Sequence, residues 1–134
     1  MNDKVNEGLY MLIRYKKDLE KIAMGLLSFM PDAKDVKKLQ KTIHRYETDE
    51  NWHLYLWREN DILGTIGLRI EDNTHAIIQH ISVNPSHRNQ GIGKRMVDEV
   101  VKKYSKKYEL TADDLVEQFF NKYKLMNETD DETK

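Results

Sequence analysis

The chain has 134 residues, enough for one domain with a hydrophobic core, and its 22 Lys and Arg nearly balance 23 Asp and Glu, giving a formal net charge of −1. This balance provides no basic face for nucleic acid, and the lack of cysteine excludes disulfides, thiolate zinc sites and a cysteine acyl-enzyme. No apolar run reaches the ~18 residues of a membrane span, and residues 1–7 lack the apolar core of a signal peptide. We therefore expect a cytoplasmic protein without a membrane or nucleic-acid partner.

The first third of the chain predicts one strand and two helices. Residues 9–15 favour a strand, and residues 17–30 carry apolar side chains at helical spacing. Pro31 and Asp32 then end one helix and start the next, because proline fits a helix edge and aspartate accepts from free N–H groups. The second helix ends near Glu47. Its apolar face carries Val36, Leu39, Ile43 and Tyr46.

The rest of the chain predicts three strands, a helix, a strand and a last helix. The three strands are expected at residues 52–58, 62–70 and 75–83. Only short turns separate them, so they should be antiparallel neighbours. An apolar stripe from Ile92 to Tyr104 indicates the next helix, and residues 108–111 and 113–124 indicate the last strand and helix. The resulting order is β-α-α-β-β-β-α-β-α.

Residues 83–94, Val-Asn-Pro-Ser-His-Arg-Asn-Gln-Gly-Ile-Gly-Lys, are the most informative segment. They place a glycine-rich turn directly before a helix, where free N–H groups and the helix dipole attract an anion. Gly91 and Gly93 let a phosphate approach the backbone. The segment is not a Walker A loop, because Arg95 stands where Ser or Thr is needed, nor a dinucleotide fingerprint, because Met96 replaces the third glycine. The alternative is an ordinary strand–turn–helix with a flexible glycine loop.

What is left is the pattern Arg-x-x-Gly-x-Gly after a strand that ends Ile-Ser-Val-Asn-Pro. It resembles the acyl-CoA-binding motif of the GNAT superfamily of N-acetyltransferases. The expected element order also resembles that family over roughly residues 11–125, with a shortened C-terminal end. The resemblance implies an α/β fold with a mixed sheet. From the polar composition of the two ends, we expect a flexible extension at residues 1–10 and a disordered acidic tail at residues 126–134.

Within the superfamily, the chain most resembles the RibT-like family associated with riboflavin operons. The resemblance lies in residues 11–17 (Met-Leu-Ile-Arg-Tyr-Lys-Lys), 20–31 and 80–88. It implies an acetyl-CoA-dependent N-acetyltransferase that is linked to riboflavin metabolism and acts as a monomer or homodimer. A small amine, a peptide N-terminus and a lysine side chain all stay open as the acceptor.

The superfamily resemblance also implies how acetyl-CoA binds. The pyrophosphate takes backbone N–H groups of the glycine loop, and the pantetheine arm pairs with the strand edge before it, in a gap beside the strand at 108–111. The thioester carbonyl is held by an N–H near Val83. A surface salt bridge for Arg88 and a solvated helix face for Lys94 and Arg95 are the alternatives. The expected binding residues are Ile81, Ser82, Val83, Arg88, Asn89, Gln90, Gly91, Ile92, Gly93, Lys94, Arg95 and Phe120.

The general acid and base are less clearly marked. Many relatives carry a tyrosine on the last helix as the acid, but Phe120 stands at that position and cannot donate a proton. Tyr123, one turn later, is the candidate acid, with a core aromatic as the alternative. His80 is the candidate base, with a structural histidine as the alternative. Strand alternation predicts that Gln79 and His80 point to opposite faces of the sheet.

Because the usual acid is missing, a CoA-binding sensor or scaffold with reduced catalysis is the rival function. His87 is either a phosphate contact or a cap of the turn. The other histidines, His44, His53 and His75, show no metal-ligand spacing, so we expect no metal. An acceptor pocket is expected between the first two helices and the central strands. Its candidate residues are Met24, Phe29, Tyr46, Tyr55 and Trp57.

Overall fold

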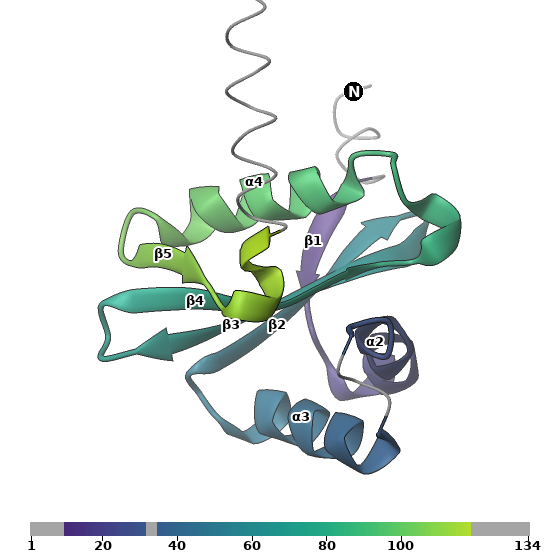
Figure 1. The fold of residues 1–134 in the computed structure, drawn as a ribbon, viewed down its shortest axis with the longest axis horizontal. Coiled ribbons are helices and arrows are strands. Elements are labelled where there is room, and N and C mark those ends of the chain that lie inside the picture. Colours follow the sequence, from purple (N-terminus) through teal and green to yellow (C-terminus); the bar gives the residue numbers. More distant parts are fainter. Residues whose placement is uncertain (1–9, 32–34, 119–134) are drawn as a thin grey trace, which may run out of the picture.

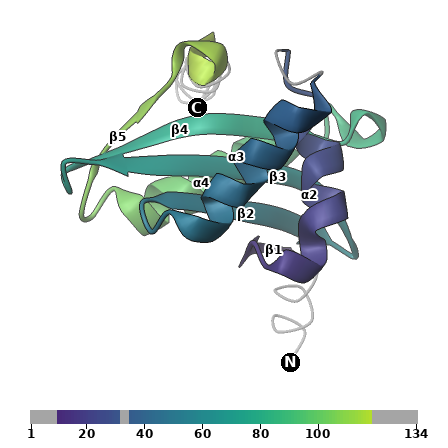
Figure 2. The ribbon, with the colours of Figure 1, turned by 90° about the horizontal axis from the view of Figure 1, so that it is seen from below.

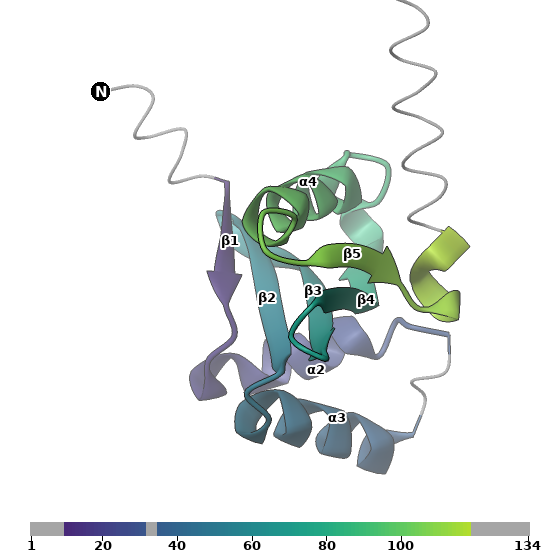
Figure 3. The ribbon, with the colours of Figure 1, turned by 90° about the vertical axis from the view of Figure 1, so that its left-hand side faces the viewer.

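The computed structural model describes residues 10–31 and 35–118, which build a five-stranded mixed sheet with helices on both faces. The strands lie in chain order across the sheet, with β1 at one edge and β5 at the other (Figure 3). They are β1 (Met11–Arg14), β2 (Trp52–Glu59), β3 (Asp61–Glu71), β4 (His75–Val83) and β5 (Glu109–Ala112). The strands β2 to β4 are antiparallel neighbours, as predicted. In addition β1 pairs antiparallel with β2, and β5 runs parallel to β4.

The helices form the outer two layers of the fold. The 3₁₀ turn η1 (Lys17–Leu19), α2 (Glu20–Leu27) and α3 (Val36–Thr48) cover one face of the sheet (Figures 1 and 2). The 3₁₀ turn η2 (Pro85–His87) leads to α4 (Ile92–Tyr104), which covers the other face. A helical turn at 114–118 follows β5. The predicted mixed α/β fold is therefore confirmed.

Several predicted boundaries need correction. The helix expected over residues 17–30 is divided into η1 and α2, and the cap of α3 is Asp35, whose carboxylate accepts from the Lys37 N–H at 2.9 Å. Asp32, which we expected to cap, lies outside the described residues. So do residues 1–9 and everything beyond residue 118.

The sheet separates two apolar clusters. One lies under α4 and is built around Ile66, Ile78, Met96, Val97 and Val100. The other lies under α2 and α3 and is built around Ala23, Leu27, Ile43, Leu54 and Leu56. Tyr55 and Trp57 pack in the α4 cluster, so our expectation that they line a pocket beside the first two helices is wrong. Because Leu54 and Leu56 face α2 and α3, strand alternation turns their neighbours to the other face.

One extra residue in β4 interrupts this alternation. Leu68 of β3 pairs with Ile78, but the preceding Gly67 pairs with His80, which leaves Gln79 as a β-bulge. As a result, Gln79 and His80 both bond to the hydroxyl of Tyr46 on α3 (Gln79 Nε2 to Oη 2.9 Å, His80 Nδ1 to Oη 2.6 Å). The prediction that these two side chains point to opposite faces is wrong, because it assumed a regular strand.

Gly67 is where the Tyr46 hydroxyl comes closest to the sheet. A Cβ at this position would overlap that hydroxyl and approach the Leu54 side chain at 3.1 Å. Replacing Gly67 by alanine should therefore lower the free energy of unfolding by about 1–3 kcal/mol, the usual cost of overpacking. Urea unfolding monitored by circular dichroism measures the change.

The matched control is Gly25→Ala, because a Cβ at this exposed position in α2 meets nothing within 4 Å. It should raise the free energy of unfolding by about 0.5–1 kcal/mol through helix propensity. Equal effects of the two substitutions would contradict the close approach of Tyr46 to Gly67.

Candidate functional site

A cavity of about 440 Å³ opens where β4 and β5 diverge. The last pair of the parallel ladder is Ile78 with Ala112, and the N–H of Asp113 still donates to the Ile78 carbonyl at 2.9 Å. Beyond this point β4 continues to Val83 without a neighbouring strand on that side among the described residues. The lining residues are Phe29, Met30, Pro31, Ile81, Ser82, Val83, His87, Arg88, Asn89, Gly91, Ile92, Gly93, Lys94, Leu115 and Val116.

A second hollow, of about 620 Å³, lies at the C-terminal end of α3. It is more open, and polar side chains such as Lys41, Arg45 and Glu50 line it. Binding sites are typically concave and largely apolar with a few directed polar groups. The smaller cavity beside β4 has this character, and it contains most of the residues that the sequence pattern selected.

The glycine loop ends on an uncapped helix N-terminus. Gly91, with φ of 80°, is the N-cap of α4 and makes no side-chain cap, and the first helical bond runs from the Arg95 N–H to the Gly91 carbonyl at 3.0 Å. The N–H groups of residues 92–94 therefore lack partners within the helix, and these residues line the cavity. Asn89 also has a positive φ, 67°. The loop is thus shaped to present several N–H groups to an anion.

Cationic side chains reinforce this end of the cavity. Arg88 and Lys94 line it, and none of the described lining residues is acidic. The Arg88 Nε donates to the Val83 carbonyl at 3.3 Å, and its guanidinium lies 5.9 Å from the centre of the Phe29 ring. The local potential is therefore positive although the chain carries a net charge of −1.

Two of the expected binding residues lie away from the lining. Arg95 pairs with Glu59 at 3.0 Å and stacks over Tyr10, on the side of β2. Gln90 is exposed and is not among the lining residues. The structure thus brings nine of the twelve expected positions together in the lining. The twelfth, Phe120, lies outside the described residues, as does the candidate acid Tyr123.

The end of β4 turns its backbone toward the cavity. The Asn84 N–H donates to the Leu63 carbonyl on β3 at 2.8 Å. Since alternate residues of an antiparallel strand direct their N–H and C=O to the same side, Ile81 and Val83 direct theirs away from β3. The Arg88 bond to the Val83 carbonyl agrees with this orientation. This edge can therefore pair with an extended chain of amides.

Two buried polar atoms at the cavity have no partner among the described residues. They are Ser82 Oγ, on a residue that is only 7% exposed, and His87 Nδ1. A buried hydroxyl without a hydrogen bond costs free energy, so such atoms point to a ligand. The sequence marked Ser82 only as part of a strand edge, and the side chain became informative through its burial.

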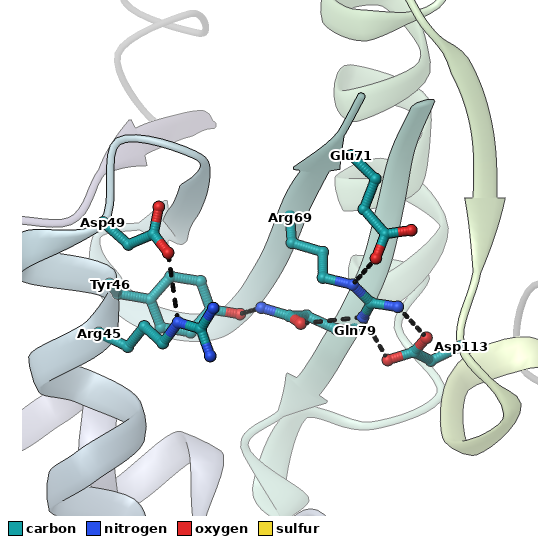
Figure 4. Close-up of polar contacts among 7 residues, drawn as sticks. All are labelled: Arg45, Tyr46, Asp49, Arg69, Glu71, Gln79 and Asp113. Carbon is teal, nitrogen blue, oxygen red and sulfur yellow. Dashed lines mark hydrogen bonds and ion pairs between the residues drawn. The ribbon is translucent and has the colours of Figure 1, made fainter. Parts of the chain in front are cut away.

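A chain of polar side chains lies at the apex of the gap (Figure 4). Arg69 on β3 makes two bonds to Asp113 (2.8 and 3.0 Å) and one to Gln79 Oε1 (3.1 Å). Hydrogen bonding to Asp113 raises the pKa of Arg69, and burial raises the pKa of Tyr46 far above its usual value, so both groups stay protonated. Sequence reasoning missed Arg69, although a lone arginine among the apolar residues of β3 was a signal.

The remaining histidines are paired elsewhere. His53 bonds to the Tyr104 hydroxyl at 2.6 Å under α4, and His75 pairs with Glu109 at 3.1 Å. Residues 10–31 and 35–118 contain no cluster of three or more His, Asp or Glu that could hold a metal ion. Within the same ranges no helix is long and apolar enough to cross a membrane.

Comparison with solved structures shows a similar fold in acetyltransferases that were solved with CoA or a CoA derivative bound. AAC(6')-Iy, solved with the bisubstrate analogue CoA-S-monomethyl-acetylneamine, superposes with a TM-score of 0.67 at 12% identity, covering 84% of this chain and 87% of that one. A GNAT family acetyltransferase from Elizabethkingia anophelis, solved with acetyl-CoA bound, gives a TM-score of 0.61 at 22% identity, covering 78% and 64%. At these identities the likeness concerns the fold.

Sequence comparison identifies the family. An uncharacterised N-acetyltransferase from the lysA 3' region of Bacillus methanolicus is 64% identical over 88 residues, which is 65% of this chain and 73% of that protein. Residues 12–120 match the sequence model of the Acetyltransferase (GNAT) family. The chain therefore belongs to the GNAT family of acetyltransferases.

Proposed function

We propose that this protein is an acetyl-CoA-dependent N-acetyltransferase that uses the cavity between β4 and β5 for its co-substrate. The observation that carries the proposal is the cavity itself, which runs from the splayed strands to the uncapped N-terminus of α4. Solved relatives of the same fold hold CoA groups, as in the Elizabethkingia anophelis enzyme with acetyl-CoA bound.

Each part of acetyl-CoA has a chemically matched partner. The pyrophosphate accepts from the N–H groups at the start of α4 and pairs with Arg88 and Lys94. The pantetheine amides bond to the backbone edge of β4 at Ile81, as an added strand does. The Ser82 hydroxyl supplies one further hydrogen bond, which its burial without a partner favours.

The transfer step is direct. The amine nitrogen attacks the thioester carbon, a tetrahedral intermediate forms, the C–S bond breaks, and the proton lost by the amine balances the proton gained by the CoA thiolate. No cysteine is present to carry the acetyl group. An N–H near Val83 can hold the carbonyl oxygen while negative charge develops on it. The Arg88 bond occupies the carbonyl of Val83 and leaves its N–H for this role.

The acceptor is an amine, and we propose that it is a small molecule or a peptide. Resemblance of residues 11–17, 20–31 and 80–88 to the RibT-like family supports a link to riboflavin metabolism, so flavin precursors belong among the acceptors to test. His80 and Ser82 share the α2–α3 side of β4, which favours this side for the approach of the amine.

A charge introduced at Gly91 tests pyrophosphate binding. Gly91→Asp should weaken CoA binding at least 10-fold relative to Gly91→Asn, because only aspartate places a negative charge beside the phosphates. The two side chains are close in size, and both are among the residues that tolerate a positive φ, so most of the backbone strain is common to the two variants. Isothermal titration calorimetry measures both affinities.

Similar affinities of the two Gly91 variants would contradict a phosphate at this loop. Failure of the folded wild type to bind CoA at millimolar concentration would reject the proposed co-substrate altogether.

Removal of the Ser82 hydroxyl separates binding from folding. Ser82→Ala should weaken acetyl-CoA binding about 3- to 10-fold, the value of one hydrogen bond, without lowering the free energy of unfolding, because the hydroxyl has no protein partner to lose. Calorimetry and urea unfolding measure the two quantities. A loss of stability with unchanged affinity would show that the hydroxyl serves the fold.

A turnover screen decides between the enzyme and the rival sensor or scaffold. Acetyl-CoA consumption is measured over small amines, peptides and flavin precursors, and we expect amide formation with at least one acceptor. If Tyr123 is not an essential acid, Tyr123→Phe should cost less than ~10-fold in rate, since an essential acid is worth ~10²–10⁴. Tight CoA binding without turnover of any acceptor would favour the sensor.

A further inference from the structure

The chain of hydrogen bonds from Asp113 to His80 has a defined direction. Arg69 donates to Asp113 and to Gln79, Gln79 donates to Tyr46, and the Tyr46 hydroxyl bonds to His80 (Figure 4 shows all but His80). The distances are 2.8, 3.1, 2.9 and 2.6 Å. The bulge in β4 makes this possible, because it turns both Gln79 and His80 toward α3.

Arginine sets the direction at one end. A guanidinium only donates, so the group that Gln79 turns toward Arg69 is its carbonyl oxygen Oε1. The amide nitrogen Nε2 is then the group that faces Tyr46, and it donates to the hydroxyl oxygen. The orientation of the Gln79 amide, which is often ambiguous, is fixed here by its partner.

The hydroxyl proton of Tyr46 completes the chain. Tyr46 is 7% exposed, and its burial keeps the hydroxyl protonated. Because its oxygen already accepts from Gln79, its proton goes to the second partner that the described residues provide, Nδ1 of His80. In the neutral imidazole one nitrogen accepts and the other carries the proton. An accepting Nδ1 leaves the proton on Nε2.

We propose that Arg69, Gln79 and Tyr46 hold His80 in the tautomer with its proton on Nε2, so that His80 serves the reaction as a hydrogen-bond donor instead of a general base. Tyr46 and Gln79 are then positioning residues. The catalytic consequence rests on the proposed acetyl transfer: Nε2–H donates to an oxygen of the bound substrates, and the amine loses its proton to another acceptor. The state of the imidazole itself does not depend on that function.

Nitrogen NMR of the wild-type protein tests the tautomer directly. Long-range ¹H–¹⁵N correlation distinguishes protonated from unprotonated ring nitrogens, and the signals of His80 are those that disappear from the five histidines in His80→Gln. We expect an unprotonated Nδ1 and a protonated Nε2 near neutral pH. A proton on Nδ1 with a bare Nε2 would overturn the proposal, whether or not the protein binds CoA.

The substitution Gln79→Glu should reverse the chain with almost no change in shape. The introduced carboxylate only accepts, so it takes a bond from Arg69 and the hydroxyl proton from Tyr46. The Tyr46 oxygen must then accept from His80, and Nδ1 should become protonated in the same spectrum. An Nδ1 that stays unprotonated in folded Gln79→Glu would show that Gln79 does not set the state of His80.

Tyr46→Phe is the matched control because it removes the hydroxyl that connects residue 79 to His80. Combined with Tyr46→Phe, the Gln79→Glu substitution should no longer move the proton to Nδ1. A proton on Nδ1 in the combined variant would mean that the carboxylate acts through its charge alone and would overturn the relay.

Kinetics separate a donor from a base once an acceptor is known. If His80 donates through Nε2, Gln79→Glu should lower kcat about 10-fold or more while the calorimetric affinity for acetyl-CoA stays within about 2-fold. A rise in kcat in Gln79→Glu would mean that the reaction is faster with an unprotonated Nε2 on His80, and it would overturn the assignment of His80 as a hydrogen-bond donor. Absence of CoA binding by the wild-type protein would instead reject the proposed function, but it would not affect the tautomer that NMR measures.

Discussion

The ion pair between Arg69 and Asp113 holds the sheet at the point where β4 and β5 part. It reaches from β3 across β4 to the residue that follows β5, and the Asp113 N–H is bonded to Ile78 at the same place. Both side chains are partly buried, with 26% and 38% of their surface exposed, and the attraction of such a pair offsets desolvation only when further partners complete it. Glu71 and Gln79 are those partners. With Asp113 fixed in this way, β5 cannot follow β4 further, and the gap beside residues 79–83 stays available to a ligand.

The extra residue in β4 decides which side chains meet that gap. Ala76 and Ile78 pack under α4 before the bulge, whereas Ile81 and Val83 do so after it. In a regular strand Ile81 and Val83 would turn toward α2 and α3, and Ser82 would enter the apolar core. One inserted residue therefore keeps the apolar positions in the core and places Ser82 at the cavity, at the cost of an unpaired position at Gln79.

Local sequence signals predicted the parts of this fold that local chemistry determines. The strands β2 to β4, the stripe of α4 and the glycine loop all follow from periodicity and turn residues within short windows. The bulge left a weaker sign, the three-residue spacing between Ile78 and Ile81, which a rule of strict alternation overlooks. The Arg69–Asp113 pair joins residues 44 positions apart, and no local pattern encodes such a contact.

The two faces of the sheet differ in how well their buried polar groups are hydrogen-bonded. Under α4 the core is closed and apolar, and even its polar members are bonded to one another, as His53 and Tyr55 are to Tyr104. At the gap the protein keeps an unpartnered buried hydroxyl, a cationic loop without acidic neighbours in the cavity lining, and a partly buried ion pair. Each of these features lowers the free energy of unfolding relative to a well-packed apolar side chain. Polar or charged groups that destabilise the fold in this way concentrate at functional sites.

The hydrogen-bond chain from Asp113 to His80 also shows why position 69 needs an arginine. An apolar residue at position 69 would leave Asp113 and Gln79 unpaired, and an accepting residue would let the Gln79 amide turn over. With arginine, every later donor and acceptor as far as His80 is determined by a group that can only donate. Arg69 thus holds β5 at the point where it parts from β4 and, through Gln79 and Tyr46, sets the hydrogen-bonding state of the histidine on β4.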